Sequence, residues 1–300
     1  MQTFRTLTQF FLALLLFAAG TTSADSLPTG TTLASGLYVE VRGKGQPVLM
    51  IPGLNSAAAT WDQTCQALQS DGLACHLVQL PGFAGQKASS YDDFLGSMTA
   101  ALLAYIDEAD LEQPVIMGHS LGGFLAMKMA IEAEPNQLGS LIIVDSLPFL
   151  PAAFNEALSP ESAKPFAESM RENMLVDDED ARAASIRHSA TTMTRDPERV
   201  NTLLQWGLAS DAHTSAQAMY ELMTQDLRPQ LSHIQQPVLI LGAWAAYQNY
   251  GATKESTRSR FERQYANMPQ FTLAFSDAGY HFLMWDDPEW LLDEVRHFLQ

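Results

Sequence analysis

The sequence predicts an α/β fold, a doubly wound and mostly parallel sheet with an inserted helical segment. Two patterns predict it. Between residues 37 and 145, short apolar runs alternate with longer amphipathic stretches, which is the order of parallel strands joined by crossover helices. From about residue 148 to 230 the strand pattern stops, and helical stretches separated by prolines and acid-rich turns replace it.

The expected strands are short and aliphatic. Residues 37–41 alternate as a strand with one exposed face, whereas the continuous apolar runs are typical of parallel strands buried on both faces. These runs lie at residues 48–51, 75–80, 115–117, 141–144, 238–241 and 271–275. Helices are expected between them, including one that places Trp61, Cys65 and Leu68 on one face, and a closing helix after Pro288.

The first 24 residues have the features of a secretory signal peptide. Arg5 precedes an apolar stretch at residues 10–19, and small residues at 22–24 provide a cleavage site. Such a stretch is shorter than the ~20 residues that a spanning helix needs. The mature protein is therefore expected to be secreted or periplasmic and to have no stable membrane span. The alternative is that the segment stays attached as an N-terminal anchor.

The remaining chain is expected to form one core with an insertion. Residues 25–147 and 233–300 are expected to build the two parts of the sheet domain, and residues 148–232 a helical cap. An insertion at this point would lie over the carboxyl edge of the sheet, where open α/β sheets bind ligands.

The charge balance limits the partners of the protein. Acidic residues outnumber basic ones 34 to 17, which gives a net charge of −17. Nucleic-acid binding needs Lys and Arg to neutralise phosphates, and docking on anionic lipid needs them too, so we expect neither. A small-molecule substrate fits better.

The cap is rich in methionine and aromatic residues, most of which are expected to form its own core and its docking face. A subset is expected to line an apolar cleft and to favour an uncharged or apolar substrate. These residues are Phe154, Phe166, Met170, Met174, Met193, Trp206, Met219, Tyr220 and Met223.

The two cysteines, Cys65 and Cys75, lie on a predicted helix and on the strand after it. In an oxidising compartment such a pair is a disulfide candidate, whereas in the cytosol it would be two buried thiols. The spacing leaves both alternatives open and suits no metal site.

A serine on a tight turn is the clearest chemical feature of the chain. Ser120 is the centre of a Gly-His-Ser-Leu-Gly sequence between a short apolar strand and a helix. In this setting the serine is exposed on a strained turn, and the small residues two positions away on either side make room for it. Ser120 is the predicted nucleophile. The alternative is a glycine-rich turn without chemistry.

A serine hydroxyl needs a base to take its proton. His281 follows the last expected strand and should lie at the same sheet edge as Ser120. His119 adjoins the serine but should point elsewhere and take a packing or hydrogen-bonding role. The developing oxyanion needs two backbone donors, for which we expect the amides of Leu54 and Leu121.

Four segments stand in the order and spacing of the α/β-hydrolase superfamily, which the chain resembles over about residues 37–299. They are Pro-Gly-Leu at 52–54, Leu-Pro-Gly-Phe at 80–83, Gly-His-Ser-Leu-Gly-Gly at 118–123 and Gly-Tyr-His-Phe at 279–282. The resemblance implies the α/β-hydrolase fold and a Ser-acid-His triad in that chain order. It names no substrate, because many chemistries share the fold.

The chain departs from the family pattern at the acid. The family usually carries it a few residues after the strand at 238–241, where this chain has Ala245 and no carboxylate before Glu255. Some relatives place the acid after the preceding strand, where Asp145 stands, and Asp145 is our first choice. Asp277 is a weaker alternative, and a Ser-His dyad supported by a neutral group such as Tyr247 is another.

Together these features predict a serine hydrolase that cleaves a carboxylic ester or related acyl bond through an acyl-enzyme, without metal or organic cofactor. Cleavage of an amide, lactone or C–C bond on the same residues is the nearest alternative. A non-catalytic binding protein with a degraded triad is the alternative from another class, motivated by Ala245.

Overall fold

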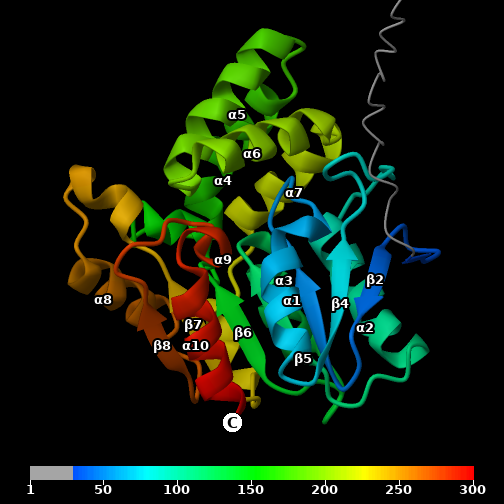
Figure 1. The fold of residues 1–300 in the computed structure, drawn as a ribbon. Helices are drawn as coiled ribbons and strands as arrows, with labels where there is room; N and C mark the ends of the chain where they lie inside the picture. Colours follow the sequence, from blue (N-terminus) through cyan, green and yellow to red (C-terminus); the bar gives the residue numbers. More distant parts are fainter. Residues whose placement is uncertain (1–29) are drawn as a thin grey trace, which may run out of the picture.

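The computed structural model describes residues 30–300, and the predicted signal peptide lies outside them. Its centre is an eight-stranded sheet with the order β1-β2-β4-β3-β5-β6-β7-β8 (Figure 1). Strand β2 pairs antiparallel with β1 and β4, and every pair from β4 to β8 is parallel. The sheet is therefore mostly parallel, as predicted.

The strands follow the predicted apolar runs, with shifts of up to two residues at their ends. Their bounds are β1 (Thr31–Thr32), β2 (Tyr38–Arg42), β3 (Gln46–Ile51), β4 (Leu73–Gln79), β5 (Val115–His119), β6 (Leu141–Val144), β7 (Val238–Gly242) and β8 (Thr272–Phe275). Only β1 was not predicted. It is two exposed residues long, so it carries no hydrophobic alternation by which it could be recognised.

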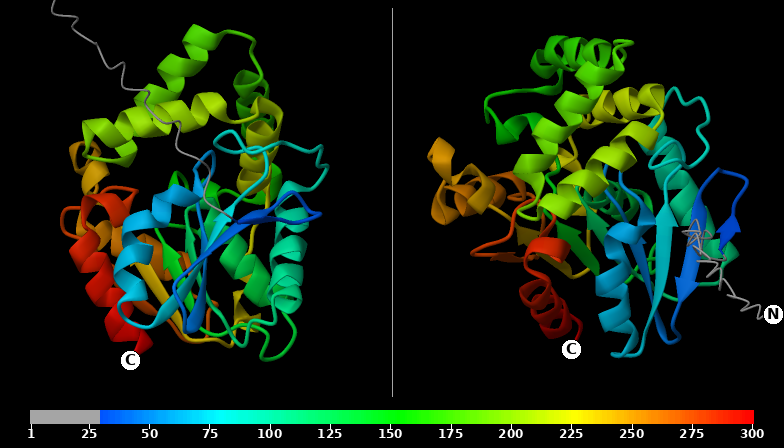
Figure 2. Two further views of the ribbon diagram at one scale, coloured as in Figure 1. Left: turned by 45° about the vertical axis from the view of Figure 1, so that its right-hand side comes forward. Right: turned by 45° about the horizontal axis from the view of Figure 1, so that its top comes forward.

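Helices cover both faces of the sheet (Figure 2). One face carries α1 (Asp62–Gln69) and α10 (Pro288–Leu299), and the other carries α2 (Phe94–Glu108), α3 (Leu121–Glu132) and α8 (Lys254–Gln264). Strand β3 packs against the helices on both faces of the sheet. Val48 and Met50 belong to one apolar cluster, and Leu49 and Ile51 belong to the other. This is why its sequence is apolar throughout.

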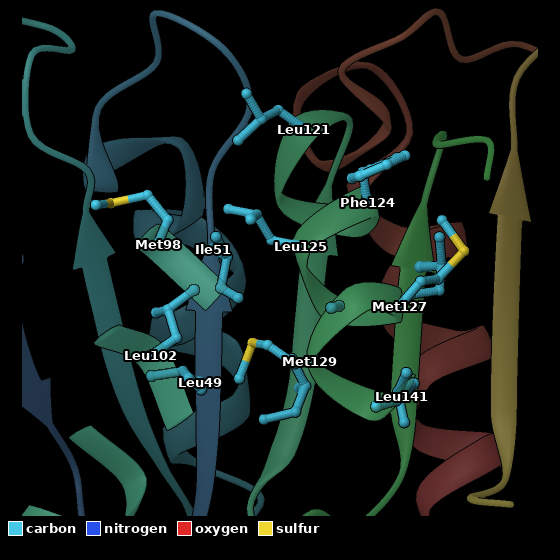
Figure 3. Packing of buried hydrophobic residues seen from close by; sticks show 14 of the residues in the cluster. Leu49, Ile51, Met98, Leu102, Leu121, Phe124, Leu125, Met127, Met129 and Leu141 are labelled. Atoms are coloured by element: carbon cyan, nitrogen blue, oxygen red, sulfur yellow. The ribbon is translucent and has the colours of Figure 1, made fainter. Parts of the chain in front are cut away.

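Helix α3 is buried along most of its length, because nine of its twelve residues are buried. Leu125 and Met129 are fully buried and lie toward Ile51 of β3 and Leu102 of α2 (Figure 3). Burying one such side chain contributes about 1.5–3 kcal/mol. This packing holds the first turn of α3, and with it the residue just before the helix, in a fixed place.

Four helices between β6 and β7 lie above the carboxyl ends of the strands (Figure 1), and we call them the cap. They are α4 (Pro160–Met174), α5 (Glu179–Met193), α6 (Pro197–Ala209) and α7 (Ala212–Thr224). Each begins at a residue whose side chain accepts a hydrogen bond from a first-turn amide. These residues are Ser159, Asp178, Asp196 and Asp211.

Short 3-10 turns connect these elements. They are η1 (Ala58–Trp61), η2 (Leu150–Ala153), η3 (Arg228–His233) and η4 (Ala245–Tyr250), and a four-residue helix, α9 (Leu283–Asp286), precedes α10. Within residues 30–300, none of the helices combines the length and apolar character that crossing a bilayer requires.

One expectation about side chains needs correction, and one open alternative is decided. Phe154 and Phe166 of the cap region are 76% and 58% exposed, so neither belongs to the cap's core. Cys65 and Cys75 are both buried and free, so the bridge that the sequence left open is not formed. The Cys75 thiol instead lies 3.5 Å from the Cys65 carbonyl oxygen, to which it donates.

A buried carboxylate joins the cap to the core. Glu221 of α7 is 4% exposed, and its two oxygens accept hydrogen bonds from the Phe94 and Leu95 amides, each at 2.7 Å. These amides open α2 and have no acceptor within their own helix. Asp93 accepts from the next one, Gly96. The first turn of α2 is thus satisfied in part by the cap.

We expect Glu221→Ala to lower the free energy of unfolding by about 2–4 kcal/mol, because it leaves two buried amides unpaired. Urea denaturation would measure this change. Glu172→Ala, at an exposed position of α4, is the control and should change it by less than about 0.5 kcal/mol. Equal effects of the two substitutions would contradict the role given to Glu221.

Candidate active site

Ser120 lies on a sharp turn between β5 and α3 and has the strained backbone angles φ 53° and ψ −117°. The turn is possible only without neighbouring side chains. A Cβ on Gly118 would lie 2.1 Å from the Gly122 oxygen, and one on Gly122 would lie 2.2 Å from the Ile51 oxygen. Both glycines of the sequence pattern are therefore required by close backbone contacts.

The backbone amide and the backbone carbonyl of Ser120 both form hydrogen bonds. Its amide donates to the Val144 oxygen of β6 at 3.0 Å, and its carbonyl accepts from Gly123 and Phe124 at 2.9 and 3.1 Å. The serine is thereby tied to the neighbouring strand and to the helix that follows. These bonds hold the side chain at the carboxyl edge of the sheet.

His281 and Asp145 meet at this edge. The Asp145 Oδ2 atom lies 2.6 Å from His281 Nδ1, and Asp145 Oδ1 accepts a hydrogen bond from the Ala243 amide at 2.9 Å. The Asp145 amide donates to the Leu241 oxygen at 2.7 Å. A positive φ of 44° turns the residue out of the strand direction. The Asp145 amide is thus held by β7, and its carboxylate is held by the residue that follows β7 while it faces the imidazole.

None of the other residues considered as support for His281 forms a hydrogen bond or ion pair with it within residues 30–300. Ala245 begins η4 and is buried, and it supplies no polar group. The Asp277 side chain is 83% exposed and forms an ion pair with Lys254 at 2.7 Å. Tyr247 is 54% exposed. Of the acids considered from the sequence, only Asp145 contacts the histidine.

His119 forms a hydrogen bond with the backbone of His281. Its ring is fully buried, and its Nε2 lies 3.0 Å from the His281 carbonyl oxygen. A carbonyl only accepts, so His119 carries its proton on Nε2. Burial lowers the pKa of His119 well below its usual value, and the nearby His281 lowers it further. The residue has the hydrogen-bonding role that the sequence predicted.

His119 directly precedes Ser120, and the centroid of its ring lies 4.5 Å from that of the His281 ring. His281 is therefore close to the serine turn. Within residues 30–300, no hydrogen bond joins Ser120 Oγ to the His281 imidazole. Catalytic hydrogen bonds are commonly long in free enzymes and shorten when substrate binds. Four histidines outside the site, His188, His213, His233 and His297, are all exposed.

The two expected oxyanion donors flank the serine. A Cβ on Gly53 would lie 3.2 Å from Ser120 Cβ, so the turn that carries Leu54 passes directly beside Ser120. Leu121 is the first residue of α3, where amides have no acceptor in the helix. In the described part of the chain, neither amide donates to another residue.

Residues 48–294 match the sequence model of the alpha/beta hydrolase family. The chain belongs to this family. Membership confirms the predicted fold and the prediction of a hydrolytic enzyme.

Two similar proteins show the range within this alpha/beta hydrolase family. A pimeloyl-(acyl-carrier protein) methyl ester esterase of Vibrio cholerae is 28% identical over 210 residues, 68% of this chain and 78% of the relative. The putative carbamate hydrolase RutD of Azorhizobium caulinodans is 32% identical over 112 residues, 36% of this chain and 40% of the relative.

Solved structures share the fold. An esterase from Exiguobacterium antarcticum has a TM-score of 0.75 at 18% identity and covers 91% of this chain and 100% of its own. An enol-lactonase from Burkholderia xenovorans has a TM-score of 0.70 at 15% identity and covers 90% and 99%.

Sequence reasoning missed the residues that brace the site. Asp286 accepts from the Tyr280 amide at 3.0 Å and from Thr194 Oγ1 at 2.7 Å, so it ties the His281 loop to the cap. Ser215 of α7 contacts Asn55 beside Leu54. No local pattern indicates these two contacts with the cap, because Thr194 and Asp286 are 92 residues apart and Asn55 and Ser215 are 160 apart.

Stability should depend on pH through buried histidines. Burial lowers the pKa of both His76 and His119, whereas the unfolded chain binds these protons near pH 6.5. Their contribution is therefore present above pH 6.5 and is lost as the pH falls toward the folded-state pKa. The free energy of unfolding should fall by up to about 1.4 kcal/mol per pH unit for each histidine.

Urea denaturation from pH 7.5 to 5.5 would measure this dependence. His76→Gln should flatten it, and His188→Gln, at an exposed position, should leave it unchanged. An unaltered slope in His76→Gln would show that this histidine does not contribute.

Proposed function

We propose that this protein hydrolyses a carboxylic ester through an acyl-enzyme on Ser120, with His281 as base and Asp145 as the acid that orients it. The observation that carries the proposal is the 2.6 Å contact between Asp145 Oδ2 and His281 Nδ1. An acid that accepts from Nδ1–H leaves Nε2 free to take the serine proton. The esterase relative supports an ester as the substrate class.

The reaction uses groups already in place. Ser120 Oγ attacks the carbonyl carbon as His281 Nε2 takes its proton, and the Leu54 and Leu121 amides hold the oxyanion. Collapse of the intermediate breaks the ester bond, and His281 returns the proton to the leaving alkoxide. A water molecule, activated by His281, then attacks the acyl-enzyme, and the carboxylic acid leaves as Ser120 regains its proton.

The substrate is proposed to be a small, uncharged or apolar ester. Apolar side chains lie at the same sheet edge as Ser120, since Leu54, Leu147 and Trp244 follow β3, β6 and β7 and are partly buried against the main apolar cluster. Such surroundings suit an acyl chain better than a charged group. After removal of residues 1–24, the enzyme is proposed to act in the periplasm or outside the cell.

Ser120→Ala should abolish hydrolysis of p-nitrophenyl butyrate and labelling by a fluorophosphonate probe. Asp145→Asn should lower kcat by about 10⁴, the loss seen when a triad aspartate is replaced without change of shape. Asp277→Asn, at an exposed acid on the His281 loop, is the matched control and should keep full activity.

Three results would count against the proposal. Unchanged turnover in Ser120→Ala would exclude the nucleophile, and unchanged turnover in Asp145→Asn would exclude the acid. A wild-type protein that the probe does not label would indicate the binding-protein alternative. Comparison with amide, lactone and carbamate substrates would test the bond that is cleaved.

A further inference from the structure

The turn that carries Leu54 has an unusual second support, from the cap. Ser56 N donates to the Gly53 oxygen at 3.2 Å and closes the turn, and Asn55 has a left-handed φ of 57°. Asparagine tolerates this conformation better than other side chains. The conformation directs the Asn55 side chain to the cap, where it meets Ser215 of α7 at 2.5 Å.

Ser215 is placed to hold Asn55 firmly. It is 2% exposed, and its Oγ also lies 2.8 Å from the Asp211 oxygen one helical turn earlier. A hydroxyl has one hydrogen to donate. If that hydrogen goes to Asp211, the Asn55 amide donates to Ser215 in its flipped orientation, and if it goes to Asn55, the amide accepts. Either arrangement keeps the contact between the turn and the cap.

The cap is itself anchored close to this point. The Asp211 amide donates to the Gly82 oxygen at 2.8 Å, and the Gly85 amide donates to the Ala209 oxygen at 3.1 Å. A Cβ on Gly82 would lie 2.7 Å from Thr214 Oγ1. The start of α7 therefore lies directly on the loop after β4, so that Ser215 has a defined position relative to the core.

On the core side, one buried residue holds the end of the same segment. Gln79 Oε1 accepts from the Ala58 amide at 2.9 Å, and its Nε2 lies within 3.4 Å of the Ser56 oxygen. These contacts fix residues 56–58. The stretch nearer the nucleophile is held within the turn by Ser56, whose Oγ donates to the Leu54 oxygen at 3.3 Å, and from the cap by the contact of the Asn55 side chain with Ser215.

We propose that Ser215 is a positioning residue which, through Asn55, sets the place of the Leu54 amide and so makes the cap a part of the oxyanion hole. This rests on the proposed function of Ser120. The contact acts on the transition state, because the amide bonds the oxygen only as its charge develops. Substrate binding by the rest of the pocket does not depend on it.

Two single variants and their double variant test the proposal. Ser215→Ala removes the hydroxyl, and Asn55→Gly removes the amide while it retains a residue that accepts the left-handed φ. Thr224→Val is the matched control, because Thr224 lies on the same helix and bonds the Tyr220 oxygen at 2.8 Å, as Ser215 bonds that of Asp211.

Loss of a whole oxyanion donor costs about 10²–10³ in kcat, so a displaced one should cost about 10-fold. We expect this loss in each single variant on p-nitrophenyl butyrate, with KM within about two-fold of the wild type. The double variant should be no slower than either single one, because both changes break the same contact. Thr224→Val should match the wild type.

A second measurement separates positioning from general damage. An alkylboronate forms a tetrahedral adduct on the serine and places an oxygen at the donors, so its inhibition constant should rise by the factor by which kcat/KM falls. The carboxylic acid product should bind unchanged. Melting curves for each variant identify loss of fold, and Asn55→Gly provides the test if Ser215→Ala does not fold.

Wild-type kcat in both single variants would overturn the inference, as would raised KM with unchanged kcat or independent losses in the double variant. A different result would contradict the proposed function. If the wild-type protein neither turns over the ester nor reacts with the fluorophosphonate, the function is wrong, whereas an active wild type with equally active variants removes only the role of Ser215.

Discussion

The backbone contact between the Ser120 turn and its neighbours is the constraint on which the site depends. Gly118 and Gly122 approach other backbone atoms so closely that a single added carbon would lie 2.1–2.2 Å from an oxygen. The strained φ of Ser120 persists because α3 is fully packed behind it and β6 bonds its amide. The Ser120 turn is rigid because the core beneath it is rigid.

Asp145 shows that the residue after β6 can supply the carboxylate that contacts His281, in place of a residue after β7. Parallel strands end at one edge, so Asp145 after β6 and the loop after β7 lie side by side. The carboxylate bonds the Ala243 amide with one oxygen and reaches His281 with the other. An acid-free loop after β7 is therefore compatible with an oriented histidine, because that loop supplies a backbone donor to the acid instead.

The cap is joined to the core at the places where the chemistry is proposed. Glu221 completes the first turn of α2, Asp286 ties the His281 loop to residues at the end of α5, and Ser215 contacts the turn of Leu54. Buried polar groups of this kind require their partners, since an unpaired one costs about 1–3 kcal/mol. The cap and the site are consequently built as one unit.

The sequence by itself determined the alternation of strands and helices, the helical insertion, the serine turn and the histidine loop, because each has a local period or glycine pattern. Only the tertiary structure decided that Asp145, and neither Asp277 nor Tyr247, meets His281, since this depends on a left-handed φ and on the pairing of β6 with β7. It also decided that Cys65 and Cys75 are free thiols and that Ser215 meets Asn55. Such contacts join residues far apart in the chain, and no local pattern specifies the geometry that brings them together.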